Sequence, residues 1–142
     1  LRTNVAWEAI SVFKTKYGAE FKIGVGTIVC VEDILKCVAM EVDFMVSPGY
    51  SALMVEQFEI SGIPFLPGVS TPGEITQGIE NGWLFFKFFP ADLFGGINAL
   101  KTYGNVFQNV KFCPTGGINK ENHLSFLALE NVLSVGGSWL LK

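Results

Sequence analysis

The segment Leu84-Phe85-Phe86-Lys87-Phe88-Phe89-Pro90 decides the fold. A short apolar run of this kind, which does not alternate polar and apolar residues, is typical of a parallel strand buried on both faces. Similar runs recur along the chain, and each leads into a turn that contains glycine or proline. The sequence therefore predicts six strands, at Phe21–Val25, Phe44–Val46, Ile63–Leu66, Leu84–Phe89, Val110–Cys113 and Val132–Val135.

Helical patterns lie between the predicted strands. Their expected apolar stripes are Val5, Ala9, Val12 and Phe13 in the first helix, Ile34, Leu35 and Val38 in the second, and Leu124, Leu127 and Ala128 in the third. Asn4 is expected to cap the first helix, because its side chain accepts hydrogen bonds from free backbone amides. Alternating strands and helices predict an α/β fold with parallel strands. Their short, nearly constant spacing favours a (β/α)8 TIM barrel, of which six of the eight units are counted.

Composition narrows the classes of protein that fit. The 142 residues are 49% apolar and 16% charged, below the roughly 25% charged residues of an average soluble domain, and they suffice for one domain. The net charge of −3 gives no basic surface for nucleic acid. No segment offers the roughly 18 apolar residues of a membrane span. Cys30, Cys37 and Cys113 are odd in number and form no CxxC pair, so reduced thiols in a cytoplasmic protein are expected rather than a disulfide framework or a metal site.

Lys87 is the first candidate for chemistry. Six apolar residues surround it in the window from Trp83 to Pro90. If its side chain points to the inside of a barrel, loss of solvation favours the neutral amine, which can attack a ketone and form a Schiff base. The alternative is a lysine on the outside of its strand, paired with an acidic residue of a helix.

Two glycine pairs follow the last two predicted strands. They are Thr115-Gly116-Gly117 and Gly136-Gly137-Ser138. Glycine lets backbone amides approach an anion closely, and TIM barrels build their phosphate site after the last two strands. A phosphate site is one reading of these loops, and two turns that only pack helices are the other.

Arg2, Thr27 and Pro48 are further candidates at predicted strand ends or near the amino terminus. The guanidinium of an arginine matches a carboxylate, and the Thr27 hydroxyl could donate to the same ligand. A solvated arginine is the alternative for Arg2.

Six motifs together resemble the family of 2-dehydro-3-deoxy-6-phosphogluconate (KDPG) and 4-hydroxy-2-oxoglutarate (KHG) aldolases. The resemblance extends over essentially the whole chain. The motifs are Val25–Thr27, Val46–Gly49, Pro67–Ile75, Phe86–Ala91, Phe112–Ile118 and Val135–Leu140. The resemblance implies a class I aldolase on a barrel, without metal or cofactor, which cleaves KDPG to pyruvate and glyceraldehyde 3-phosphate. It also implies a homotrimer. The expected binding partner is the small-molecule substrate, a phosphorylated 2-oxo acid, and neither nucleic acid nor a membrane is expected as a partner.

The same resemblance implies a role for each candidate residue. Lys87 matches the Schiff-base lysine. Arg2 and Thr27 match residues that bind the pyruvyl carboxylate, and Thr115 helps to hold that end of the substrate. The pocket-lining positions are matched by Pro48 and Phe89, and the phosphate-binding loops by Gly116, Gly117, Gly137 and Ser138.

One departure concerns the start of the chain. The resemblance places the family's catalytic glutamate just before Leu1, so a barrel domain over residues 1–142, truncated at both ends and low in turnover, is expected. An aldolase for 4-hydroxy-2-oxoglutarate or for the 6-phosphogalactonate analogue of KDPG is the alternative enzyme. A catalytically inactive domain that binds a phosphorylated ligand is the alternative of another class.

Overall fold

The computed structural model describes residues 1–141, which form two compact units, 1–66 and 67–141. The helices are α1 (Ala6–Tyr17), α2 (Val31–Ala39), α3 (Ala52–Ser61), α4 (Pro72–Glu80), α5 (Gly96–Val106), α6 (His123–Leu127) and the 3-10 helix η1 (Ser138–Leu141). The strands are β1 (Gly24–Gly26), β2 (Phe44–Val46), β3 (Phe65–Leu66), β4 (Gly68–Val69), β5 (Phe85–Phe88) and β6 (Lys111–Pro114). Each unit contains three strands, all paired in parallel.

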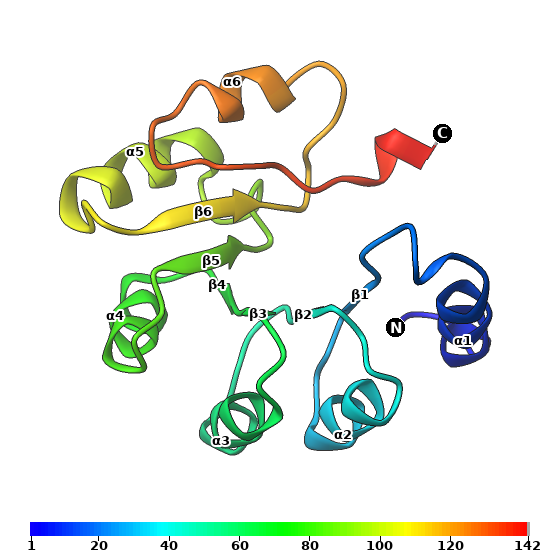
Figure 1. Cartoon of the computed structure of the whole chain (residues 1–142). Helices are drawn as coiled ribbons and strands as arrows, with labels where there is room; N and C mark the ends of the chain where they lie inside the picture. Colours follow the sequence, from blue (N-terminus) through cyan, green and yellow to red (C-terminus); the bar gives the residue numbers. More distant parts are fainter. Residues whose placement is uncertain (142) are drawn as a thin grey trace. The chain divides into compact units, whose positions relative to one another are not determined.

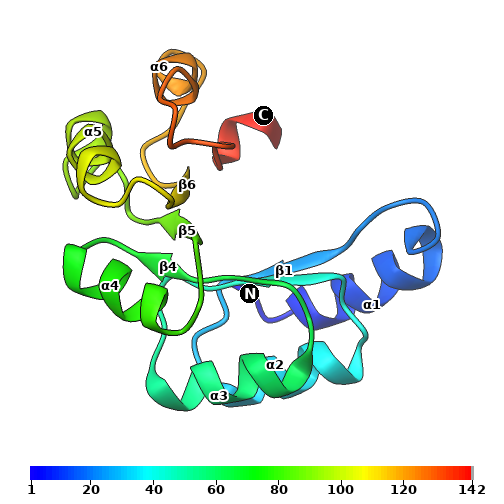
Figure 2. The same cartoon turned by 60° about the vertical axis from the view of Figure 1, so that its left-hand side comes forward.

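In the first unit, helices α2 and α3 cover one face of the sheet β1-β2-β3 (Figure 1, Figure 2). Val25 and Met45 are neighbours in register and both point to these helices, because side chains alternate between the faces of a strand. They meet Ile34 and Cys37 of α2, together with Phe58 of α3, and all five are buried. This cluster is the core of the unit, and it orients β1 and β2 so that their carboxyl ends lie side by side.

In the second unit, β5 lies between β4 and β6, and α5 packs on one face of this sheet. Phe86, Phe88 and Phe112 are buried on that face. The Tyr103 ring of α5 lies 5.9 Å from Phe88 and 6.2 Å from Phe112, measured between ring centroids. The alternation that buries Phe86 and Phe88 places Lys87, the residue between them, on the opposite face.

A strand forms at each predicted run except the last, but β1 begins at Gly24 rather than at Phe21, and β3 begins at Phe65 rather than at Ile63. Val132–Val135 is not a strand: it contributes an isolated bridge between Val132 and Phe112, and a second bridge joins Thr115 to Gly136. The strand β4, just after Pro67, was not predicted, because its two residues Gly68 and Val69 are too few to form an apolar run. The α/β architecture with parallel strands is confirmed.

The prediction that strands are buried on both faces is wrong. The faces turned away from the helices remain partly accessible in the described residues. Phe44 is 40% exposed and Phe85 is 55% exposed. Each sheet therefore has one face packed by helices and one on which side chains such as Lys87 reach solvent.

The helices form where they were predicted, but the residues that pack differ. In α1 the predicted stripe is wrong: Val5, Val12 and Phe13 are exposed, and Trp7 and Ile10 contact the core instead. The predicted Asn4 cap is also wrong, because Val5 is the N-cap and makes no capping hydrogen bond through its side chain.

The other two stripes are correct only in part. In α2, Ile34 is buried as predicted, but Cys37 is its buried companion, while Leu35 and Val38 are exposed. In α6 the buried residue is Phe126, and Leu124 and Leu127 are exposed. Within residues 1–141, none of the helices combines the length and the apolar character needed to span a bilayer.

Candidate active site

Lys87 sits on β5, on the face opposite to α5. Its backbone amide donates to the Pro67 carbonyl at 2.8 Å, and its Cα is in register with Gly68 and Cys113 on the neighbouring strands. The side chain is half-buried, and its Nζ lies 4.4 Å from the centroid of the Phe89 ring. The structure thus brings the predicted nucleophile and the predicted pocket residue Phe89 into contact, and it excludes a lysine on the helix-covered side of the strand.

A loop formed by Thr115, Gly116 and Gly117 begins at the carboxyl end of β6. The Thr115 amide donates to the Phe88 carbonyl at 2.9 Å, so this loop lies next to the end of β5. Gly116 has φ +93° and Gly117 has φ +80°, a conformation that side chains disfavour. A Cβ at Gly117 would lie 2.3 Å from the Cβ of Asp92, so glycine is also required there for space.

The hydrogen bonds of this loop leave amides available. The carbonyl groups of Thr115 and Gly116 accept hydrogen bonds from the Ala91 and Asp92 amides at 2.9 and 3.1 Å. Within residues 1–141, the backbone amides of Gly116 and Gly117 donate no hydrogen bond. Adjacent backbone N–H groups without partners form a site at which an anion can bind.

The second glycine pair lies beside the first. Gly136 forms an isolated parallel β-bridge with Thr115, and its amide donates to the Pro114 carbonyl at 2.9 Å. A Cβ at Gly136 would lie 2.6 Å from the Thr115 hydroxyl oxygen, so the two loops are in direct contact. Gly137 follows, and Ser138 begins η1 with an exposed side chain. The structure therefore gathers the four predicted phosphate-binding residues beside Thr115.

The remaining predicted residues belong to the first unit. Thr27 follows β1 and has φ +64°, which is strained for a β-branched residue and is a feature that concentrates at functional sites. The Leu1 amino group donates to the Gly26 carbonyl, which places the exposed Arg2 one residue from a contact with the end of β1. Pro48 follows β2 and is half-buried. The Ile28 amide donates to the Val46 carbonyl at 3.2 Å, so the ends of β1 and β2 are joined.

Two residues that support this site, Asn122 and Trp139, were not found from the sequence. The Asn122 amide group donates to the Gly117 carbonyl at 2.9 Å, and the ring of Trp139 lies against Gly137. Asn119 and Asn122 follow the two glycines within five residues, which is a turn signal visible in the sequence, whereas the contact of Trp139 is not visible there.

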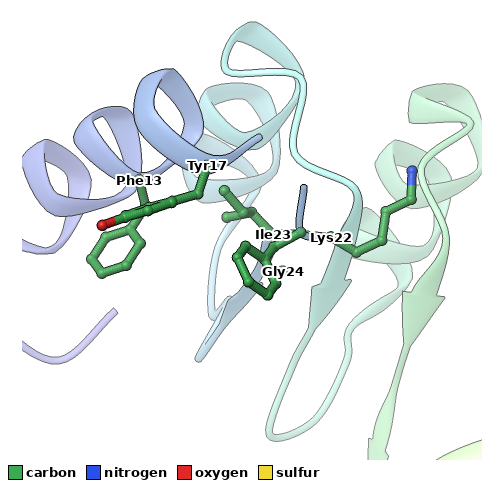
Figure 3. Close-up of a pocket in the computed structure, with 6 residues that line it drawn as sticks. Phe13, Tyr17, Lys22, Ile23 and Gly24 are labelled. Carbon is green, nitrogen blue, oxygen red and sulfur yellow. The ribbon is translucent and has the colours of Figure 1, made fainter. Parts of the chain in front are cut away.

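A hollow of about 510 Å³ in the first unit contains none of the predicted site residues. It lies at the amino end of β1 and is lined by Phe13, Tyr17, Phe21, Lys22, Ile23 and Gly24. Figure 3 shows the Phe13 and Tyr17 side chains on one side, while Lys22 extends away from them. Lys22 forms an ion pair with Asp43 at 3.2 Å, so its charge is engaged outside the hollow.

The whole chain, residues 1–142, matches the family model described as KDPG and KHG aldolase. A 2-dehydro-3-deoxy-phosphogluconate aldolase of Pseudoalteromonas atlantica is 39% identical over 140 residues, which are 99% of this chain and 65% of that protein. The chain thus spans about 65% of the length of this curated relative.

Two solved structures are similar over the same range. One is the KDPG aldolase of Legionella pneumophila with pyruvate captured as a covalent carbinolamine, which has a TM-score of 0.96 at 41% identity. The match covers 99% of this chain and 68% of the Legionella chain. The 2-keto-3-deoxy-6-phosphogluconate aldolase of Zymomonas mobilis, with 3-phosphoglycerate, has a TM-score of 0.92 at 37% identity. That match covers 99% of this chain and 66% of the other.

Proposed function

The chain belongs to the KDPG and KHG aldolase family, and from this membership we propose that it acts as a class I aldolase that cleaves KDPG to pyruvate and glyceraldehyde 3-phosphate. The observation that carries the proposal is the position of Lys87, half-buried on the side of β5 that the helices leave accessible. An amine in this position can reach a ligand, whereas one under α5 could not. The Legionella relative holds pyruvate as a carbinolamine, the adduct that precedes a Schiff base.

The reaction at Lys87 begins with attack of its amine on C2 of the 2-oxo acid. The adduct loses water and becomes a protonated imine. The imine accepts the electron pair of the C3–C4 bond when that bond breaks, which leaves an enamine on the lysine. A general base takes the proton of the C4 hydroxyl in the same step, and this carbon becomes the aldehyde of glyceraldehyde 3-phosphate. Protonation of the enamine at C3, followed by hydrolysis, releases pyruvate and restores Lys87.

The phosphate end of the substrate fits the two glycine loops. The unpartnered amides of Gly116 and Gly117 are the donors that a phosphate needs, and Gly137 and Ser138 lie in the adjoining loop. The Zymomonas relative holds 3-phosphoglycerate, a ligand with the same chemical group. These donors favour a phosphorylated substrate over 4-hydroxy-2-oxoglutarate, which has no phosphate.

For the carboxylate end we propose Arg2 and Thr27 as the binding residues. The guanidinium pairs with a carboxylate, and Thr27 offers a hydroxyl at the end of β1. Thr115 and the pocket residues Pro48 and Phe89 complete the proposed set. A (β/α) barrel over residues 1–142, a homotrimer and a cytoplasmic location remain part of the proposal.

The test measures pyruvate released from KDPG by the protein and by two lysine variants. Lys87→Met removes the nucleophile and is expected to reduce cleavage to the background rate. Lys101→Met is the control, because Lys101 is an exposed lysine of α5 outside the proposed site. It is expected to keep the original rate. Cleavage that continues in Lys87→Met would reject the proposal. Faster cleavage of 4-hydroxy-2-oxoglutarate than of KDPG would identify 4-hydroxy-2-oxoglutarate as the preferred substrate.

A further inference from the structure

His123 and Trp139 form an aromatic pair next to the glycine loops. His123 is the first residue of α6, and its ring centroid lies 5.6 Å from that of Trp139, with the ring planes inclined by 38°. Nδ1 of His123 lies 2.9 Å from the Lys120 carbonyl oxygen. Because a carbonyl can only accept, Nδ1 carries the hydrogen, and this hydrogen bond fixes the orientation of the ring. The imidazole is therefore a fixed surface against which the indole packs.

Trp139 in turn contacts the backbone of Gly137. A Cβ built on Gly137 would lie 1.8 Å from an atom of the Trp139 ring, so the indole occupies the place that a side chain would take. The same Cβ position is 2.9 Å from the Ile118 carbonyl oxygen. The indole and the Ile118 carbonyl therefore both lie on the side of Gly137 that a side chain would take, and they leave room there for glycine alone.

The start of α6 holds both glycine loops through two successive residues. Asn122 binds the Gly117 carbonyl with its side-chain amide at 2.9 Å, and its Oδ1 accepts from the Asn119 amide at 2.8 Å. His123, the next residue, supports Trp139 and through it Gly137. One loop is therefore held by a hydrogen bond and the other by aromatic packing.

We propose that the His123–Trp139 pair acts as a clamp that positions the amide of Gly137 toward the substrate phosphate. The clamp rests on the proposed function in one respect, namely that the two glycine loops bind a phosphate. His123 itself is a positioning residue, because it acts through Trp139. Its loss is expected to weaken the binding of phosphorylated ligands and to leave the chemistry at Lys87 unchanged.

The experiment compares four forms of the protein: unchanged, His123→Ala, His123→Phe and Leu124→Ala. Phenylalanine keeps a ring for Trp139, and Leu124, 67% exposed on the same helix, is a matched control outside the pair. The first readout is the Kd for inorganic phosphate by calorimetry. An aromatic pair is worth enough to predict a rise of about 2- to 12-fold in His123→Ala. His123→Phe and Leu124→Ala are expected to bind as the unchanged protein does.

The second readout separates binding from chemistry. In His123→Ala the KM for KDPG is expected to rise by the same factor as the Kd, with kcat retained, while the KM for 4-hydroxy-2-oxoglutarate stays unchanged. An equal change for both substrates would show a merely structural role and overturn the clamp. Should His123→Ala not fold, His123→Gln takes its place, since glutamine also lacks the ring.

The outcomes distinguish the clamp from the proposed function. An unchanged Kd for phosphate in His123→Ala refutes the clamp, even where Lys87 still reacts with pyruvate. No phosphate binding by the unchanged protein refutes it as well. If Lys87 does not react with pyruvate, the proposed aldolase activity is wrong, while the comparison of phosphate affinities still decides on the clamp.

Discussion

Replacing Glu74 with alanine is expected to lower the free energy of unfolding by about 1–2 kcal/mol at pH 7. Glu74 Oε2 accepts four hydrogen bonds, from the amides of Ser70 and Thr71, both at 2.8 Å, and from their hydroxyls at 3.1 and 2.9 Å. Loss of a helix cap typically costs about 1 kcal/mol, and hydrogen bonds to a charged group exceed this. The Glu74 side chain is only partly buried, and this keeps the expected loss of unfolding free energy close to that of a helix cap.

The charge of Glu74 makes this stabilisation depend on pH. Burial opposes ionisation, but the hydrogen bonds from Ser70 and Thr71 outweigh it and hold the pKa of Glu74 below its ordinary value of 4.5. A carboxyl group with a lowered pKa in the folded state stabilises the protein above the unfolded pKa. The contribution is lost as the pH falls through the folded pKa. Glutamine at this position keeps one acceptor oxygen, so Glu74→Gln is expected to cost about half as much and to remove the pH dependence.

Urea unfolding at pH 7 and at pH 3 measures both effects. The difference in unfolding free energy between the unchanged protein and Glu74→Gln is expected to be present at pH 7 and to be smaller at pH 3, where part of the carboxyl groups are protonated. Glu80→Gln is the control, because Glu80 is exposed at the other end of α4, where a negative charge is slightly unfavourable. Equal stability of Glu74→Ala and the unchanged protein at pH 7 would refute the reasoning, as would a difference that persists undiminished at pH 3.

Three further predictions concern buried groups. Phe88→Ala is expected to destabilise the protein by about 3–5 kcal/mol in urea unfolding. Phe85 lies on the same strand but is 55% exposed, so Phe85→Ala is expected to cost far less, and equal costs would contradict the assigned faces of β5. Burial raises the pKa of Cys37 to about 11, so its thiol is expected to react with a disulfide reagent at pH 8 only after unfolding, and rapid reaction of the native protein would be a contradiction. Asn131→Ala removes the 2.8 Å hydrogen bond to the Leu100 carbonyl and is expected to cost about 1–3 kcal/mol, which an unchanged unfolding curve would disprove.

The strands could be predicted from the sequence because they combine short apolar runs with glycine or proline at their ends. The exception at Val132–Val135 has a physical reason. An apolar run forms a strand when consecutive residues form β-bridges, and here the structure has isolated bridges at Val132 and, just beyond the run, at Gly136. Pairing with a residue distant in sequence, such as Phe112, leaves no mark in the run itself.

The packed faces of the helices were harder to predict. In α1 apolar side chains occur on more than one side, so the stripe through Val12 and Phe13 was as plausible as the one through Trp7 and Ile10. A helix of this kind does not specify its buried face by periodicity alone. In α2 the small side chain of Cys37 fills a core position that the larger apolar residues nearby do not.

The candidate site shows the same division. Lys87 could be picked out because a lysine among apolar residues is unusual locally, and the glycine pairs because each follows one of the last two predicted strands. The supports of these groups, Asn122 and Trp139, depend on contacts that appear only in three dimensions. The orientation of Lys87 needed the structure too, since a run apolar on both sides does not say which face the helices cover.

Reductive trapping of pyruvate tests directly whether Lys87 is the nucleophile. The protein is incubated with pyruvate and borohydride, digested, and mapped by mass spectrometry, which reports imine formation without requiring cleavage of a carbon–carbon bond. We expect one modified residue, Lys87, and no adduct in Lys87→Met. An adduct on Lys101 or Lys111 with Lys87 unmodified would contradict it.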